Sequence, residues 1–149
     1  MKLYLHILII LNFLFLNLIF SQEETTKFYI TELRGDISLE MEINNLESNK
    51  GPIYIRILDE NENPVIVGTS PVINYSAEIS FDSISTGKYA IQFFHDENEN
   101  QKMDFNLIGI PKEKFGSSNN VKPVLGPPKF EKMLINLNQN KKIIIIPVN

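Results

Sequence analysis

Apolar and polar residues alternate along most of the chain after residue 35. In the segment 36–46, every second residue from Ile37 to Ile43 is apolar, and the residues between them are polar. This period of two is typical of a β-strand with one buried face, whereas an amphipathic helix repeats about every 3.6 residues. The same alternation returns in 53–57, 75–82, 88–93 and 133–138. The pattern predicts half-buried strands, and no segment after residue 22 shows a helical period.

The order of these segments predicts a fold class. Turn residues such as Gly51-Pro52 and Gly87 separate them. The chain closes with the β-branched run Ile143–Val148, which is typical of a strand buried on both faces. Short strands with turn residues between them indicate an all-β protein. We expect an antiparallel β-sandwich of immunoglobulin-like or prealbumin-like type, with about six or seven strands and one long flap that contains Gly and Pro.

The segment Phe105–Lys129 interrupts the alternation and contains three Gly and four Pro residues. A connection of this length in a compact domain is usually functional or disordered. Disordered segments are poor in apolar residues. This one has eight large ones, which are Phe105, Leu107, Ile108, Ile110, Phe115, Val121, Val124 and Leu125. We therefore expect an ordered flap whose apolar side chains pack across the sandwich.

The first 21 residues differ from the rest of the chain. Residues 3–20 are nearly all apolar, Lys2 precedes them, and Ser21 provides a small residue before a polar run. This order is typical of a secretory signal peptide. A transmembrane anchor is the alternative, although spanning usually needs about 20 apolar residues. We divide the chain into a signal peptide (1–21), an N-terminal lead-in (22–34) and a single β-sandwich domain (35–149). The expected location is exported, periplasmic or extracellular, with no membrane span after signal cleavage.

Composition excludes several classes of function. Loss of residues 1–21 would remove one lysine and no acid, so the formal charge would change from −4 to −5. Nucleic-acid binding is not expected, because phosphate contacts need clustered Lys and Arg. The chain has no Cys, and its only His after residue 21 is His95, which excludes thiolate and multi-histidine metal sites. The expected partner is a protein or a glycan.

The pentapeptide DENEN occurs twice, at 59–63 and at 96–100. Calcium is bound by six to eight oxygens, which a short loop supplies from alternate positions. In the second copy, positions 1, 3, 5, 7 and 9 of such a loop hold Asp96, Asn98, Asn100, Lys102 (through its carbonyl) and Asp104. The hypothesis is a metal site with Ca²⁺ as its cofactor. The alternative is a plain turn, in which Asp and Asn side chains accept hydrogen bonds from the local backbone.

Both copies depart from a tight calcium loop. In the second copy Gln101 stands at position 6, where Gly is usual, and no Glu occupies position 12. Glu113 in the flap is the nearest acidic residue that could complete the ligand set. In the first copy Pro64 and Val67 occupy positions 6 and 9, so we interpret that copy as a turn after the strand 53–58.

Several motifs follow one another in the middle of the chain. They are "HDENENQKMD" at 95–104, "GIPKEKFGSSNN" at 109–120 and "GPPKF" at 126–130. Together they resemble the bacterial family called domain of unknown function 2141, over roughly residues 35–148. The resemblance implies an exported bacterial β-sandwich without a settled activity. Gln101, Lys114 and Ser117 stand where the family usually has Gly, Gly and Phe, which predicts a weaker metal loop and looser packing of the flap.

Three functions are consistent with these features. The leading hypothesis is an exported, non-enzymatic module, stabilised by calcium, that serves binding or structure in the periplasm or at the cell surface. The first alternative is a glycosidase-like hydrolase that uses the carboxylates of Asp96, Asp104 and Glu113. The second is an accessory module that binds carbohydrate on aromatic side chains, for which the candidates are Tyr54, Tyr75, Tyr89, Phe93 and Phe94. No residue is assigned as catalytic, because no nucleophile motif is present.

Overall fold

The computed structural model describes residues 27–30, 34–124 and 126–148. The predicted signal peptide (1–21) and most of the lead-in lie outside these residues. The described elements, in chain order, are β1 (Lys27–Ile30), β2 (Ile37–Ile43), β3 (Ile53–Asp59), β4 (Pro64–Ser70), β5 (Ala77–Ile84), β6 (Gly87–His95), β7 (Phe115–Ser117), η1 (Ser118–Asn120), α2 (Phe130–Met133), β8 (Ile135–Leu137) and β9 (Lys141–Ile145).

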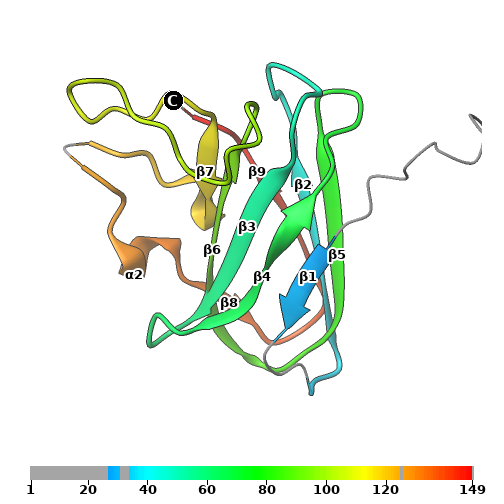
Figure 1. Cartoon of the computed structure of the whole chain (residues 1–149). Helices are drawn as coiled ribbons and strands as arrows, with labels where there is room; N and C mark the ends of the chain where they lie inside the picture. Colours follow the sequence, from blue (N-terminus) through cyan, green and yellow to red (C-terminus); the bar gives the residue numbers. More distant parts are fainter. Residues whose placement is uncertain (1–26, 31–33, 125, 149) are drawn as a thin grey trace, which may run out of the picture.

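The strands form two sheets that face each other (Figure 1). One sheet has the order β1-β4-β3-β6, and β7 and β8 share the remaining edge of β6. The other has the order β5-β2-β9. The prediction of an all-β sandwich is therefore confirmed. Its assignment to an immunoglobulin-like or prealbumin-like type stays a prediction.

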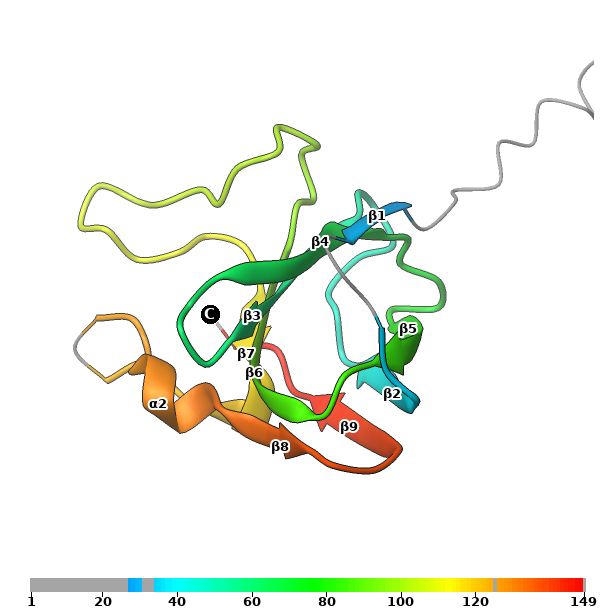
Figure 2. The ribbon, with the colours of Figure 1, turned by 90° about the horizontal axis from the view of Figure 1, so that it is seen from below.

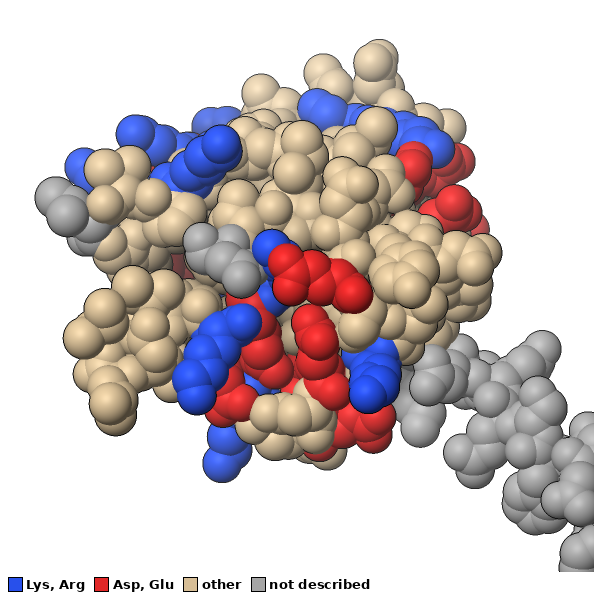
Figure 3. Space-filling view, turned by 90° about the horizontal axis from the view of Figure 1, so that it is seen from above, with Lys and Arg blue, Asp and Glu red and all other residues tan. Residues whose placement is uncertain are grey.

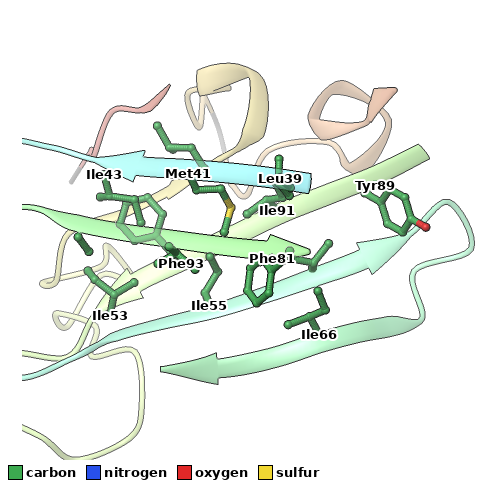
Figure 4. Packing of buried hydrophobic residues seen from close by; sticks show 14 of the residues in the cluster. Leu39, Met41, Ile43, Ile53, Ile55, Ile66, Phe81, Tyr89, Ile91 and Phe93 are labelled. Atoms are coloured by element: carbon green, nitrogen blue, oxygen red, sulfur yellow. The ribbon is translucent and has the colours of Figure 1, made fainter. Parts of the chain in front are cut away.

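The core lies between the two sheets, where the alternating apolar side chains meet. The buried cluster includes Leu39, Met41 and Ile43 of β2, Ile53, Ile55 and Ile57 of β3, and Ile91 and Phe93 of β6 (Figure 4). These are the positions that the period of two assigned to the inner face. Full burial of one such side chain stabilises the fold by about 1.5–3 kcal/mol, so the sandwich needs no covalent link.

Strand β4 carries no visible alternation in the sequence. Its inward positions hold Ile66, Gly68 and Ser70, all of which are buried. Only the first of these is apolar and large. A pattern search based on apolar residues misses such a strand, and this is one reason why the described residues contain more strands than the six or seven expected.

The C-terminal strand differs from the prediction. β9 pairs with β2 in parallel, from Leu39 opposite Lys141 to Ile43 opposite Ile145. Ile145 is buried, but Ile144 and Ile146 are 53% and 54% exposed. The expectation of a strand buried on both faces is therefore wrong. The three-stranded sheet contributes one face to the core, and no other described element covers its outer face.

The flap also differs from the prediction. Its chain is hydrogen-bonded, but the side chains of Phe105, Leu107, Ile108, Ile110 and Val124 are exposed. They do not pack across the sandwich as expected. Together with residues 96–104, which precede it, the flap forms two loops, 96–114 and 121–129, separated by β7 and η1. Both loops project from the same side of the molecule in two perpendicular views (Figures 1 and 2).

Ser118 closes the gap between β7 and β8 along the edge of β6. β7 pairs with Gln92–Phe94 and β8 pairs with Gly87–Tyr89, so the backbone between them lacks a strand partner. The Ser118 hydroxyl accepts a hydrogen bond from the Ile91 N–H (3.0 Å) and donates one to the Met133 carbonyl. The buried side chain of Ser118 therefore replaces the backbone hydrogen bonds that a strand would form at this point of β6.

The next two residues extend this connection. The side-chain amide of Asn119 donates to the carbonyls of Lys132 (2.9 Å) and Leu134 (3.0 Å). Asn120 donates to the Ile144 carbonyl (3.2 Å) and accepts from the Ile146 N–H (2.7 Å), as a neighbouring strand would. The Ser-Asn-Asn motif thus connects β6, the segment 132–134 before β8 and the C-terminal segment.

We predict that Ser118→Ala lowers the free energy of unfolding by about 1–3 kcal/mol, because it leaves a buried N–H and a buried carbonyl without partners. Urea unfolding measures the change. Ser80→Ala, an exposed serine on β5, is the matched control and should change the free energy by less than about 0.5 kcal/mol. Equal stability of the two variants would contradict the bridging role.

Candidate functional site

The second DENEN loop begins where β6 ends, at a buried anchor. His95 and Asp96 are both fully buried. The Asp96 N–H donates to the Pro52 carbonyl (3.0 Å), and Nε2 of His95 lies 2.8 Å from the Lys50 carbonyl oxygen. A Cβ on Gly51, whose φ is +69°, would lie 1.8 Å from the Asp96 carbonyl oxygen. Only glycine fits there, so the Gly-Pro dipeptide is part of the site, although in the sequence it resembles a simple turn.

The side chain of Asp96 stabilises a tight turn of the loop. Its carboxylate accepts hydrogen bonds from the N–H groups of Asn100 (3.1 Å) and Gln101 (2.6 Å). Asn98 Oδ1 accepts from Asn100 (3.2 Å), and Asn100 Oδ1 accepts from Lys102 (2.8 Å). The polar side chains at positions 1, 3 and 5 therefore all bond to the backbone of the same short loop.

Gln101 occupies a glycine-like conformation. Its φ is +64°, in the left-handed region where a tight calcium loop has Gly. The loop has therefore kept its path without the glycine. The left-handed conformation costs a non-glycine residue about 1–2 kcal/mol, so the substitution affects stability rather than geometry.

Asp104 and Glu113 complete the cluster. Asp104 Oδ2 accepts from the side-chain amides of Asn98 (2.6 Å) and Asn100 (3.1 Å). The Asp104 N–H donates to Glu113 Oε2 (3.2 Å), and the Lys112 N–H donates to the Asp104 carbonyl (2.8 Å). The two arms of the loop thus meet, and Glu113 joins the residues that the sequence predicted.

One oxygen of this cluster is buried and unpaired. Glu113 is 6% exposed, and its Oε1 has no hydrogen-bond partner among the described residues. Leaving a buried carboxylate oxygen without a partner is costly. Such a group in a folded protein calls for a specific explanation, and a bound cation would supply one.

The electrostatics agree with this geometry. Burial raises the pKa of the Glu113 carboxyl above its ordinary value, and the negative charges of Asp96 and Asp104 also raise it. The hydrogen bond from the Asp104 backbone and the nearby His95 act in the opposite direction. The carboxylates of this cluster therefore destabilise one another when no cation lies between them.

The acidic side chains alone do not form a metal centre. Within the described ranges, no group of three or more His, Cys, Asp or Glu side chains is arranged to hold a metal ion. The predicted set differs from such a group, because Asn98 and Asn100 would contribute amide oxygens and Lys102 a backbone carbonyl. Any site here depends on neutral oxygens as much as on carboxylates.

The first DENEN copy is a turn, as predicted. It connects β3 to β4, and Asp59 Oδ1 accepts from the N–H groups of Asn61 and Asn63, each at 2.9 Å. Glu62 at φ +66° corresponds to Glu99 at φ +59° in the second copy. The two copies share one turn geometry, and only the second is followed by Asp104 and Glu113.

The aromatic candidates for carbohydrate binding do not form one surface. Tyr89 and Phe93 are buried in the core, and Tyr75 lies exposed in a separate turn between β4 and β5. Tyr54 and Phe94 stack on each other with ring centroids 5.1 Å apart. Each of these two rings covers a face of the other, which leaves less aromatic surface for a sugar.

We predict that Glu113→Gln stabilises the calcium-free protein at neutral pH. A carboxyl with a raised folded-state pKa binds its proton more tightly in the folded than in the unfolded chain. The free energy of unfolding of the wild type should therefore fall, relative to the variant, as pH rises from the ordinary value of 4.5 through the raised value.

Urea unfolding over a pH series with a chelator measures this difference. Glu78→Gln, at an exposed position on β5, is the control and should show no such trend. A constant difference between Glu113→Gln and the wild type across the series would contradict the predicted cost of burying this charge.

The comparisons with known proteins identify a family. Among the residues that the structure describes, no helix is long and apolar enough to cross a membrane. No curated protein and no solved structure matches the chain. The family model for an uncharacterised protein conserved in bacteria, DUF2141, matches residues 41–145. This match confirms the resemblance of the motifs, and the chain therefore belongs to the DUF2141 family.

Proposed function

We propose that the protein is an exported, non-enzymatic β-sandwich module whose flap is held by calcium, and that it serves binding or structure in the periplasm or at the cell surface. The observation that carries the calcium proposal is the buried, unpaired Oε1 of Glu113 beside the loop 96–104. The basic, apolar and small-residue order of residues 2–21 supports export.

The donor set favours calcium over other cations. Asp96, Asn98, Asn100, Asp104, Glu113 and the Lys102 carbonyl would together offer six or more oxygens and no nitrogen or sulfur. Calcium takes six to eight oxygens in flexible geometry, whereas zinc prefers nitrogen and sulfur. A carboxylate has about four lone-pair sites, so Asp96 can accept two backbone N–H groups and still bind a cation.

The hydrogen bonds of the carboxylates support a non-enzymatic role. A glycosidase needs one carboxyl that donates a proton and a second that faces the substrate. Asp96 is fully buried, and both of its oxygens accept backbone hydrogen bonds. Asp104 Oδ2 already accepts from two amides. Because these side chains hold the loop, a structural use of them is favoured over a hydrolase.

We predict that millimolar calcium raises the melting temperature of the wild type relative to a chelator. A ligand at 100 times its Kd stabilises by about 2.7 kcal/mol, which corresponds to a shift of several degrees for a domain of this size. Asp104→Ala and Glu113→Gln should lose most of this increase in melting temperature, because each variant removes a carboxylate that would bind the calcium ion. Differential scanning calorimetry measures it, with magnesium as the control ion.

The first DENEN copy provides a matched control variant. Asp59→Ala removes the same residue type from the same turn, and its basal melting temperature should fall because Asp59 holds the β3–β4 turn. Its calcium shift should stay at the wild-type value. A wild-type melting temperature that does not respond to calcium, or an equal response in Asp104→Ala, removes the calcium proposal.

A further inference from the structure

The end of the flap is a tight hairpin held by its own hydrogen bonds. Phe105 and Pro111 form a β-bridge, and the Asn106 N–H donates to the Ile110 carbonyl (2.9 Å). Asn106 Oδ1 accepts from the N–H groups of Ile108 (3.0 Å) and Ile110 (2.9 Å). Gly109, at φ +80°, allows the reversal. These contacts fix the backbone of residues 105–111, which we call the flap tip.

The flap tip presents large apolar side chains to solvent. Leu107 is 107% exposed and Ile108 is 79% exposed, and Phe105 and Ile110 are about half exposed. Val124, in the neighbouring loop 121–129, is 87% exposed. Both loops project from the same side of the molecule (Figures 1 and 2). A concentration of exposed apolar side chains at one ordered tip marks an interaction site rather than ordinary surface.

Exposed lysines lie on both sides of the flap tip in the sequence and in the neighbouring loop. Lys102 and Lys112 flank the flap tip, and the second loop and α2 contribute Lys122, Lys129 and Lys132. All five are exposed, and none forms an ion pair with a residue that the structure describes. Figure 3, seen from above, shows Lys and Arg side chains on the left, the side from which the loops project, with Asp and Glu side chains next to some of them.

The acidic residues of the same region are less accessible. Glu113 is buried and Asp104 is half-buried, so Glu131 is the one exposed acid between residues 102 and 132. The stretch 102–132 of an otherwise acidic chain is therefore locally basic, with six lysines and three acids, although the half-buried Glu97 and the exposed Glu99 precede it in the same loop. A partner that fits it combines negative charge with an apolar interior that a protruding tip can enter.

We propose that the flap tip inserts into a membrane surface that contains anionic phospholipid. Leu107 and Ile108 would reach the acyl region, and the lysines would lie at the level of the phosphate groups, as in interfacial anchors. The protruding shape favours a lipid surface, because a rigid partner would need a matching cavity. The inference rests on the proposed function, since export places the flap beside an envelope membrane.

Calcium would assist this contact. Asp96, Asp104 and Glu113 lie at the base of the flap, and their negative charge opposes approach to an anionic surface. A calcium ion in the loop 96–104 reduces that charge. Binding to anionic lipid is therefore strongest with calcium present and weaker in a chelator.

Vesicle flotation tests the proposal with the purified protein. The vesicles are phosphatidylcholine alone or phosphatidylcholine with phosphatidylglycerol, each in millimolar calcium and in chelator. We expect flotation with the phosphatidylglycerol vesicles, and a loss of about tenfold or more in Leu107→Ser/Ile108→Ser. Ile144→Ser is the matched control, because Ile144 is 53% exposed on β9 and is not part of the flap tip. It should float like the wild type.

The increase in melting temperature on addition of calcium, measured on the same variants, distinguishes the lipid proposal from the calcium proposal. The double variant should keep the shift, which shows that it is folded with its loop intact. Absence of flotation with phosphatidylglycerol vesicles despite a wild-type melting shift overturns the lipid proposal alone, as does equal flotation of the double variant. Flotation without any melting shift supports the lipid proposal and removes the calcium site from the proposed function.

Discussion

Strand β6 is hydrogen-bonded along both edges, and both loops of the flap start or end beside it. One edge pairs with the whole of β3, from Ile53 opposite His95 to Asp59 opposite Tyr89. The other edge is divided between β7 and β8, with Ser118 bridging the gap. Because β6 ends in the buried pair His95-Asp96, the same strand also fixes where the polar loop begins. The position of the candidate site therefore depends on the pairing of one strand.

Buried polar atoms that lack a hydrogen-bond partner mark places where burial lowers the stability of the fold. Among the described residues His95 Nδ1, Glu113 Oε1 and Ser117 Oγ are buried without a hydrogen-bond partner, and His95 Nδ1 lies 3.7 Å from Glu97 Oε1. Two of them belong to the residues around the loop 96–104. Elsewhere the polar side chains with special roles, such as Ser118, Asn119 and Asn120, are paired with backbone groups. The unpaired Oε1 of Glu113 is therefore the observation at this corner on which the calcium proposal rests.

The three residues that depart from the family pattern have different consequences. Gln101 adopts the left-handed conformation in place of glycine, so the loop keeps its shape at a cost in stability. Lys114 forms an ion pair with Glu47 at 2.8 Å, which ties the return of the flap to the β2–β3 connection. Ser117 is buried with an unpaired hydroxyl, where a phenylalanine would provide apolar contact. The sequence predicts a weaker metal loop from Gln101 and looser packing of the flap from Lys114 and Ser117, and of the last two only Ser117 fits its prediction.

The sequence by itself determined the alternating strands that line the core and the DENEN turn, but not β4. Alternation at 36–46 or 88–93 predicts a half-buried strand because the β-pleat is local, and DENEN predicts a turn because Asp and Asn bond to their own backbone. The tertiary structure alone decided that β9 lies parallel to β2, that Leu107 and Ile108 remain in solvent, and that Glu113 meets Asp104. Each of these features depends on contacts between segments that are far apart in the sequence. Such contacts produce no periodic pattern of apolar residues, so they cannot be recognised from the sequence alone.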